Sequence, residues 1–178
     1  EGKEYSVVDL PGTYSLGAFS EDEVVARNFI LTGNPDIIID VIDASNIERN
    51  LYLTTQLLEM GKKVVIALNM IDEAQKREIK FDIEGLSKKL GVPVIPTVAS
   101  KGKGIEDVVK AAIKQMGKTL IVENPIRYSA AVTQHVAHLE RELKKNKLPF
   151  PVKWTALKVI ECDDTILSAI KKSNPNQE

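Results

Sequence analysis

Lys63 and Asn69 bracket an unbroken apolar run, Val64-Val65-Ile66-Ala67-Leu68, and Met70-Ile71-Asp72 follows it directly. A short apolar run without polar alternation is typical of a strand that is buried on both faces of a parallel sheet. Two further runs lie at residues 37–43 and 92–98. Because helical patterns separate the three runs, the sequence predicts an α/β fold with right-handed crossovers.

Capping residues and glycines mark the helices between these runs. Ser20 and Glu23 form a capping box, the pattern that typically opens a helix. We also predict a short strand at residues 5–8, where aromatic and β-branched residues gather. The predicted helices follow Ser20, span residues 47–60 before Gly61, run from the cap Asp82 to Gly91, and span residues 105–116 before Gly117.

The pattern changes after Pro125, where no long strand run appears. Apolar residues from Val132 to Leu143 recur at spacings of four and three, which predicts a helix. Residues 149–151, Pro-Phe-Pro, end it, and a second helical stretch follows with Trp154 as the expected core anchor. The sequence therefore predicts an α/β domain at residues 1–122 and a small all-helical domain at residues 123–178.

Composition excludes several classes of protein. The 178 residues carry a net charge of -1, which gives no electrostatic case for binding nucleic acid or an anionic membrane surface. The single cysteine, Cys162, excludes an internal disulfide. No apolar run approaches the roughly 20 residues of a membrane span, so the chain itself is not expected to insert into a membrane. His135 and His138 are expected to face solvent rather than bind a metal.

A motif near the start of the sequence carries the first chemical signal. Asp9-Leu10-Pro11-Gly12 follows the predicted strand at residues 5–8. The Asp9 carboxylate is a hard oxygen ligand that can hold Mg²⁺ directly or through water. Gly12 lets a backbone N–H approach a phosphate closely. The alternative is a plain turn, since Asp-x-x-Gly is common in turns.

The loop after residue 68 carries the second signal. Asp72 can accept two hydrogen bonds from the N1–H and N2–H₂ edge of guanine, a pair that adenine does not offer. Asn69 is expected to brace the loop and contact the purine, with Met70 and Ile71 between them. The alternative is structural: Asn69 as the N-cap of the next helix and Asp72 in its first turn.

The loop after the third strand run completes the pattern. Val98-Ala99-Ser100 precedes a glycine-rich entry into the long helix, and the small side chain of Ala99 lets its N–H reach a base carbonyl. An ordinary strand-to-helix loop is the alternative. Ligands bind outside the carboxyl ends of strands in open α/β sheets. Three such loops, in the order phosphate, base, base, therefore favour a site for GTP or GDP with Mg²⁺.

At these motifs the chain resembles a known family. Trp154 lies in a segment, residues 153–161, that resembles the helical domain of ferrous iron transport protein B. Met70, where many GTPases have lysine, is a trait of that family, whereas Val98 and Ser100 depart from its more usual residues. The segments that resemble its G domain are residues 9–16, 20–27, 43–53 and 67–72.

The resemblance implies a Ras-like P-loop GTPase sheet with flanking helices, incomplete at its N-terminus, followed by a small all-helical domain. It implies a cytoplasmic regulatory GTPase attached to a membrane permease for Fe²⁺, on the cytoplasmic face of the inner membrane. The permease part of the parent protein is then a partner, and a homo-oligomer is a further possibility. The helical domain is expected to modulate nucleotide affinity or to relay the switch.

A phosphate-cradling loop, G-x-x-x-x-G-K-[ST], does not precede Asp9. Residues 112–119 nearly match it, but there a helix precedes the glycine, the reverse of the order that phosphate binding requires. The resemblance places the family's phosphate loop, first switch and a central strand upstream of residue 1. Residues 5–8 and 37–43 are therefore not expected to pair directly with each other.

Gly12 and Thr13 are the candidate catalytic residues. Thr13 stands where many small GTPases have a water-orienting glutamine, so we predict slow intrinsic hydrolysis. Two alternatives remain open at this point: a ribosome- or RNA-associated GTPase of the same superfamily, and a non-catalytic interaction module. The near-neutral charge argues against the first.

Overall fold

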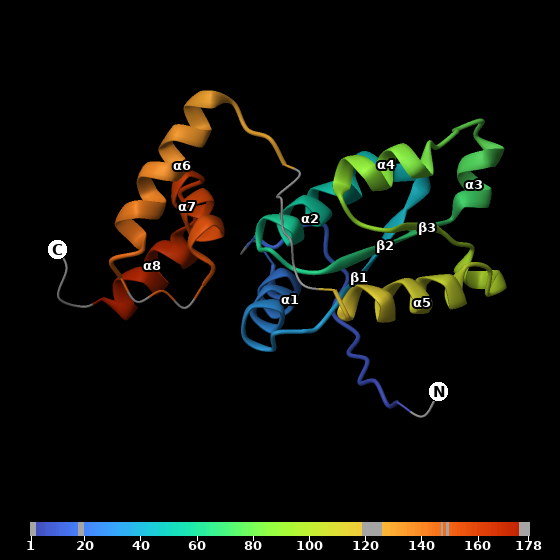
Figure 1. The fold of residues 1–178 in the computed structure, drawn as a ribbon, viewed down its shortest axis with the longest axis horizontal. Helices are drawn as coiled ribbons and strands as arrows, with labels where there is room; N and C mark the ends of the chain where they lie inside the picture. Colours follow the sequence, from blue (N-terminus) through green and yellow to red (C-terminus); the bar gives the residue numbers. More distant parts are fainter. Residues whose placement is uncertain (1–2, 18–19, 119–125, 147, 149, 175–178) are drawn as a thin grey trace.

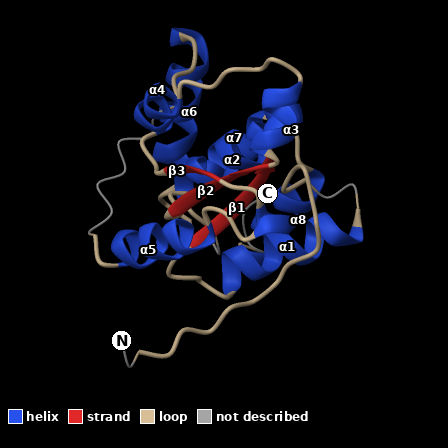
Figure 2. Cartoon of the chain, turned by 90° about the vertical axis from the view of Figure 1, so that its right-hand side faces the viewer, coloured by secondary structure: helices blue, strands red, loops and turns tan. Residues whose placement is uncertain are grey.

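A three-stranded parallel sheet lies at the centre of the chain (Figure 2). The computed structural model describes residues 3–17, 20–118, 126–146, 148 and 150–174. The strands β1 (Ile38–Asp43), β2 (Val64–Asn69) and β3 (Val94–Pro96) lie in the order β1-β2-β3. Both pairings are parallel, which confirms the predicted α/β class.

Alternate side chains of β2 supply two different cores. Val64, Ile66 and Leu68 belong to the larger core, which also contains residues of α1 and α2. Val65 and Ala67 face the other side of the sheet and pack against Val108 and Ala112 of α5. This division follows from the two-residue repeat of a strand. The helices of this part are α1 (Glu21–Thr32), α2 (Ile47–Glu59), α3 (Ile71–Lys76), α4 (Ile83–Leu90) and α5 (Ile105–Met116), with 3₁₀ helices η1 (Ala44–Asn46) and η2 (Ala99–Lys101).

The capping signals are confirmed where the sequence placed them. Ser20 accepts a hydrogen bond from the Glu23 amide at 3.2 Å at the start of α1. Asp82 accepts one from the Gly85 amide at 2.9 Å at the start of α4. Gly91, just after α4, has a left-handed φ of 68°. The residues that nearly matched a phosphate loop lie in α5 as far as Met116, and Thr119 falls outside the described residues.

The strand predicted at residues 5–8 is wrong. The segment runs as a loop in which Val7 is 89% exposed (Figure 1). A strand needs a hydrogen-bonded neighbour, and within the described residues β1 pairs with β2 alone. The segment makes no ladder with β1 there, and the side chains of Ile39 and Val41 on β1 are exposed.

Among its described residues, the C-terminal part contains three helices: α6 (Ala130–Leu143), α7 (Val152–Ile160) and α8 (Asp164–Ser173). The single second stretch that the sequence predicted is therefore two helices. The chain turns at Cys162, whose φ is 56°, and Asp163 caps α8 by accepting from the Thr165 and Ile166 amides. These contacts end one helix and start the next within four residues.

Trp154 anchors the C-terminal helices, as predicted. Its side chain is fully buried, its ring meets Phe150 edge-on at 5.7 Å, and it shares the larger core with Ile30 of α1. The two parts are thus packed into one core, although the predicted boundary at residues 122 and 123 lies outside the described residues. No helix in the described ranges is long and apolar enough to cross a membrane.

Both histidines, His135 and His138, are exposed on α6, as predicted. The Nδ1 atom of His135 lies 2.7 Å from the Ala131 carbonyl oxygen one turn earlier. Across the residues that the structure describes, no group of three or more His, Cys, Asp or Glu side chains is placed to hold a metal ion.

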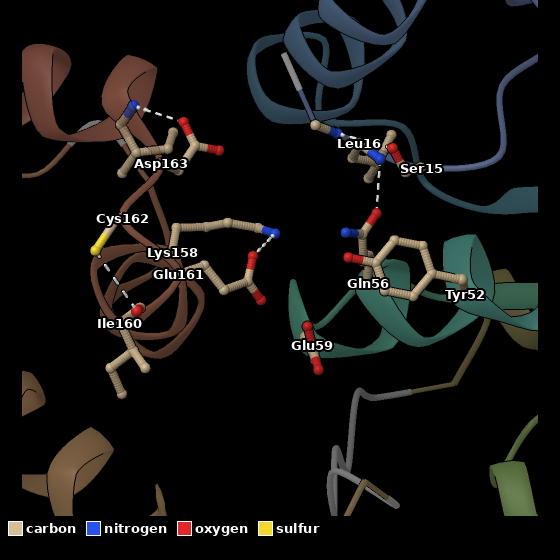
Figure 3. A network of polar contacts seen from close by, with 12 residues as sticks. Ser15, Leu16, Tyr52, Gln56, Glu59, Lys158, Ile160, Glu161, Cys162 and Asp163 are labelled. Carbon is tan, nitrogen blue, oxygen red and sulfur yellow. Dashed lines mark hydrogen bonds and ion pairs between the residues drawn. The ribbon is translucent and has the colours of Figure 1, made fainter. Parts of the chain in front are cut away.

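Charged side chains line the junction between α1, α2 and the C-terminal helices (Figure 3). Arg27 of α1 is buried and lies 3.5 Å from Asp163. Lys158 of α7 is also buried and donates to Glu161 at 2.5 Å. Glu59 of α2 accepts a hydrogen bond from the Tyr128 hydroxyl, and burial raises the pKa of Glu59 to about 7.

Asp40 is the buried carboxylate of the sheet. It lies on β1 with its oxygen 2.5 Å from the Thr54 hydroxyl of α2, which donates to it. Burial raises the pKa of Asp40 from 3.8 to about 6, and the Thr54 bond offsets part of that rise. The folded protein therefore binds this proton more tightly than the unfolded chain, and stability falls as pH rises from about 4 to about 6.

We expect Asp40→Asn to remove this pH dependence while keeping an oxygen that accepts from Thr54. At pH 8 the variant should be more stable by up to about 3 kcal/mol, and near pH 4 the difference should vanish. Urea unfolding across this pH range measures both. Asp36→Asn, at an exposed position just before β1, is the matched control. An equal gain at every pH would contradict the assignment.

Candidate functional site

Three loops leave the sheet at the carboxyl ends of its strands. β1 passes into η1, β2 passes into α3, and β3 passes into η2 (Figure 1). Because neighbouring parallel strands end at one edge, the loops after β2 and β3 lie next to each other. Polar side chains are concentrated in these loops.

Asn69 joins the second and third loops. Its Oδ1 atom accepts a hydrogen bond from the Ala99 amide at 2.9 Å and one from the Thr97 hydroxyl at 3.3 Å. The alternative role as a helix N-cap is wrong, because Met70 occupies that position. Asn69 thus holds η2 against the end of β2, while its contact with a purine stays a prediction.

Met70 and Ile71 turn the chain from β2 into α3. Met70 adopts a left-handed φ of 58°, which is uncommon for a residue other than glycine, and its side chain is exposed. The Ile71 amide donates to the Thr97 carbonyl at 3.3 Å, so this loop too is tied to the end of β3. The turn at Met70 places Asp72, two residues further along the chain, at the surface.

Asp72 lies in the first turn of α3 with both carboxylate oxygens engaged. Oδ2 lies 2.6 Å from the Lys101 ammonium, and Oδ1 accepts from the Glu73 amide at 3.1 Å. The hydrogen bond from Lys101 holds the pKa of Asp72 below its usual range. An ionised carboxylate with two accepting oxygens is the group that the N1–H and N2–H₂ edge of guanine requires.

The loop around η2 is held by its own backbone. Val98 is buried and pairs with Lys103 through hydrogen bonds at 3.1 and 3.2 Å, whereas Ala99 and Ser100 are exposed. The loop enters α5 at Gly104, whose φ is 80°. A Cβ atom there would lie 2.4 Å from the Pro96 carbonyl oxygen, so only glycine fits.

Residues 9–12 form an extended loop rather than a turn beside the base-reading loops. Asp9 and Gly12 are exposed, and a Cβ added to Gly12 would meet nothing within 4 Å. Leu10 packs against the larger core, and Pro11 is half-buried. Within the described residues, no hydrogen bond or ion pair joins this loop to the loops after β2 and β3, so their assembly into one site stays a prediction.

The segment that follows Gly12 is anchored more firmly. The Thr13 hydroxyl donates to the Ser15 carbonyl at 2.6 Å, and the Ser15 hydroxyl donates to Glu23 of α1 at 2.5 Å. Leu16 is fully buried, and its amide donates to the Gln56 side chain of α2 at 2.6 Å (Figure 3). The segment is therefore fastened to two helices of the core.

Sequence reasoning missed Gln56 and the aromatic contact beside it. The Arg49 guanidinium lies 3.7 Å from the centre of the Tyr14 ring. Gln56, a buried polar residue on α2, needs a hydrogen-bond partner. This contact left only a weak signal in the sequence, because residue spacing does not identify the partner.

Asp43 marks the carboxyl end of β1 at the same edge. Its carboxylate accepts from the Ser45 amide and hydroxyl at 2.7 Å and from Asn46 at 2.8 Å. Burial acts to raise the pKa of Asp43, but these hydrogen bonds outweigh it and leave the pKa below its usual range. The carboxylates of Asp43, at the end of β1, and of Asp72, in the loop after β2, therefore both favour the ionised form at this edge of the sheet.

Two family models match the chain. One, described as ferrous iron transport protein B, matches residues 1–112, and the other, described as the FeoB cytosolic helical domain, matches residues 128–178. The Fe(2+) transporter FeoB of Escherichia coli K12 is 42% identical over 164 residues. These cover 90% of this chain and 21% of that protein, so the chain spans about a fifth of the curated relatives it matches.

Solved structures agree with the sequence comparisons. The cytosolic domain of the T. maritima FeoB iron transporter in a GDP form superposes with a TM-score of 0.85 at 38% identity, over 93% of this chain and 66% of that one. The mGMPPNP-bound NFeoB from S. thermophilus gives 0.80 at 37% identity, over 91% of this chain and 61% of that one. The predicted fold is confirmed by these matches.

We expect Asn69→Ala to release η2 from the end of β2. The Ala99 amide loses its acceptor, so its hydrogen exchange should accelerate by about threefold to tenfold, the range for one net hydrogen bond. NMR exchange rates measure this directly. Thr97→Val is the control, because it removes only the 3.3 Å hydroxyl contact and should leave Ala99 protected. Unchanged exchange in Asn69→Ala would show that the amide is held by something else.

Proposed function

This chain belongs to the family of ferrous iron transport protein B, and from that membership we propose that it binds guanine nucleotide and hydrolyses GTP to GDP. One observation carries the proposal: Asn69 and Asp72 lie at the end of β2 and just after it, and a hydrogen bond and an ion pair tie them to Ala99 and Lys101 in the loop after β3. The T. maritima FeoB cytosolic domain has been solved in GDP and GMPPNP forms, which supports the same ligand.

Asp72 selects the base in this proposal. An ionised carboxylate pairs with the two donors of guanine and meets no such donors on adenine. Asn69 contacts the purine, Met70 and Ile71 form the wall between them, and the loop 98–100 closes the site through the Ala99 backbone. Ala99 is exposed and the Asp72 side chain is partly exposed, so a base can reach both once their present partners give way.

The phosphate side falls to residues 9–13. The Asp9 carboxylate is a hard oxygen donor on an exposed loop, which fits Mg²⁺ bound through water. When bound, Mg²⁺ neutralises charge on the phosphates. The open space beside Gly12 fits the close approach of a phosphate to its N–H.

Hydrolysis is expected to be slow. The Thr13 hydroxyl donates to the Ser15 carbonyl, so it is committed to the loop and does not replace a water-orienting glutamine. The attacking water is then placed by the Gly12 backbone or by groups outside this chain. Ordering of residues 12–16 around the γ-phosphate would reach α1 and α2 through Glu23 and Gln56.

In the parent protein we propose that this domain regulates an Fe²⁺ permease from the cytoplasmic side of the membrane. Trp154 shares one core with residues of α1 and α2. A movement of these helices would therefore change the packing around Trp154, which supports a helical domain that responds to nucleotide state. A homo-oligomer stays a further possibility. The net charge of -1 continues to argue against the RNA-associated alternative.

We expect Asp72→Asn to weaken GDP binding by about tenfold to a hundredfold, the range for a charged hydrogen-bonded pair, and to favour xanthosine diphosphate instead. Titration with fluorescent GDP and its xanthine analogue measures both affinities. Asp82→Asn, a helix-cap substitution away from the site, is the control. If the wild-type chain binds no GDP, the non-catalytic alternative is favoured. Unchanged base preference in Asp72→Asn would refute the assignment of this residue.

A further inference from the structure

We propose that Lys101 competes with guanine for the carboxylate of Asp72 and thereby lowers the affinity of this chain for guanine nucleotide. The inference rests on the proposed function, because it concerns the same base-reading site. Its starting point is the 2.6 Å ion pair between the Lys101 Nζ atom and Asp72 Oδ2. That oxygen is one of the two that guanine needs.

The groups proposed to read the base already have hydrogen-bond or ion-pair partners within the protein. Lys101 occupies one oxygen of Asp72, the Glu73 amide donates to the other, and the Ala99 amide donates to Asn69. A guanine base that arrives at this site must therefore exchange with existing partners rather than add to open ones. The free energy of binding is then the difference between the two sets of contacts.

Lys101 is held in position for this contact. It is the last residue of η2, and its amide donates to the Val98 carbonyl at 2.9 Å. Gly102 follows with a left-handed φ of 67°, and Lys103 returns to pair with Val98. The backbone of the loop thus fixes where the Lys101 side chain starts, next to α3.

The other nearby charges do not replace Lys101. Lys76 of α3 lies 2.7 Å from Glu73 and is committed to that carboxylate. Lys103 belongs to the same loop as Lys101 and is exposed, but the described ion pairs join Asp72 to Lys101 alone. The competing ammonium is therefore one identifiable side chain, and it can be removed singly.

The exposure of the pair sets the size of the effect. Lys101 is 58% exposed and Asp72 is 26% exposed, so water and salt screen their attraction. Exposed pairs of this kind change equilibria by a factor of roughly two to five. The competition from Lys101 is consequently expected to lower nucleotide affinity modestly and in a salt-sensitive way, without preventing binding.

The test compares Lys101→Met with Lys103→Met in the 178-residue chain. Both variants remove one positive charge from the same loop, but only Lys101→Met releases Asp72. GDP is titrated at low and high salt while the amide NMR signals of Glu73 and Ala99 are followed, with ADP as the base control. We expect Lys101→Met to bind GDP about two to five times more tightly than Lys103→Met, and the ratio to shrink at high salt.

The outcomes separate this inference from the proposed function. Equal affinities of the two variants, or weaker binding by Lys101→Met, with GDP still preferred over ADP, would overturn the competition and leave the guanine site standing. Absence of GDP binding in the wild type and both variants would overturn the proposed function, and the inference with it. In the nucleotide-free protein, a rise in the Asp72 pKa in Lys101→Met confirms that the ion pair existed in solution.

Discussion

Burial of β2 on both faces is the constraint on which the rest of the structure depends. Its alternate side chains fill two separate cores, so neither face can be exposed without loss of one of them. That placement puts β1 and β3 on either side of it and brings the ends of β2 and β3 together. Asn69 then needs only to reach across to the Ala99 amide to join two loops. The candidate site is in this sense a product of the sheet.

Much of this arrangement could be predicted because its signals are local. Apolar runs, a capping serine and glycines after helices each act within a few residues, and they placed the three strands and the helices α1, α2, α4 and α5. Residues 5–8 were mispredicted because pairing, not composition, makes a strand. The break at Cys162 was missed because cysteine is not a turn residue, although Asp163 was an available cap.

The candidate site also has a part that local sequence signals predicted and a part that they did not. Asp72 and Asn69 were predicted as site residues from their position after a strand, and the structure ties their loop to the loop after β3. The bond from Leu16 to Gln56 joins residues 40 positions apart, and no local pattern encodes such a pairing. The ion pair of Asp72 with Lys101 was likewise hidden, since two charged residues 29 positions apart give no sign that they meet. Long-range polar contacts are the part that required coordinates.

The outer edge of β1 has a practical consequence for handling this chain. Its backbone amides and carbonyls face outward without a partner among the described residues, flanked by the exposed apolar side chains of Ile39 and Val41. Such an edge is a template for adding strands from other molecules, and natural proteins normally protect it with charge, proline or a covering segment. At high protein concentration, an unprotected edge of this kind favours strand pairing between copies of the chain.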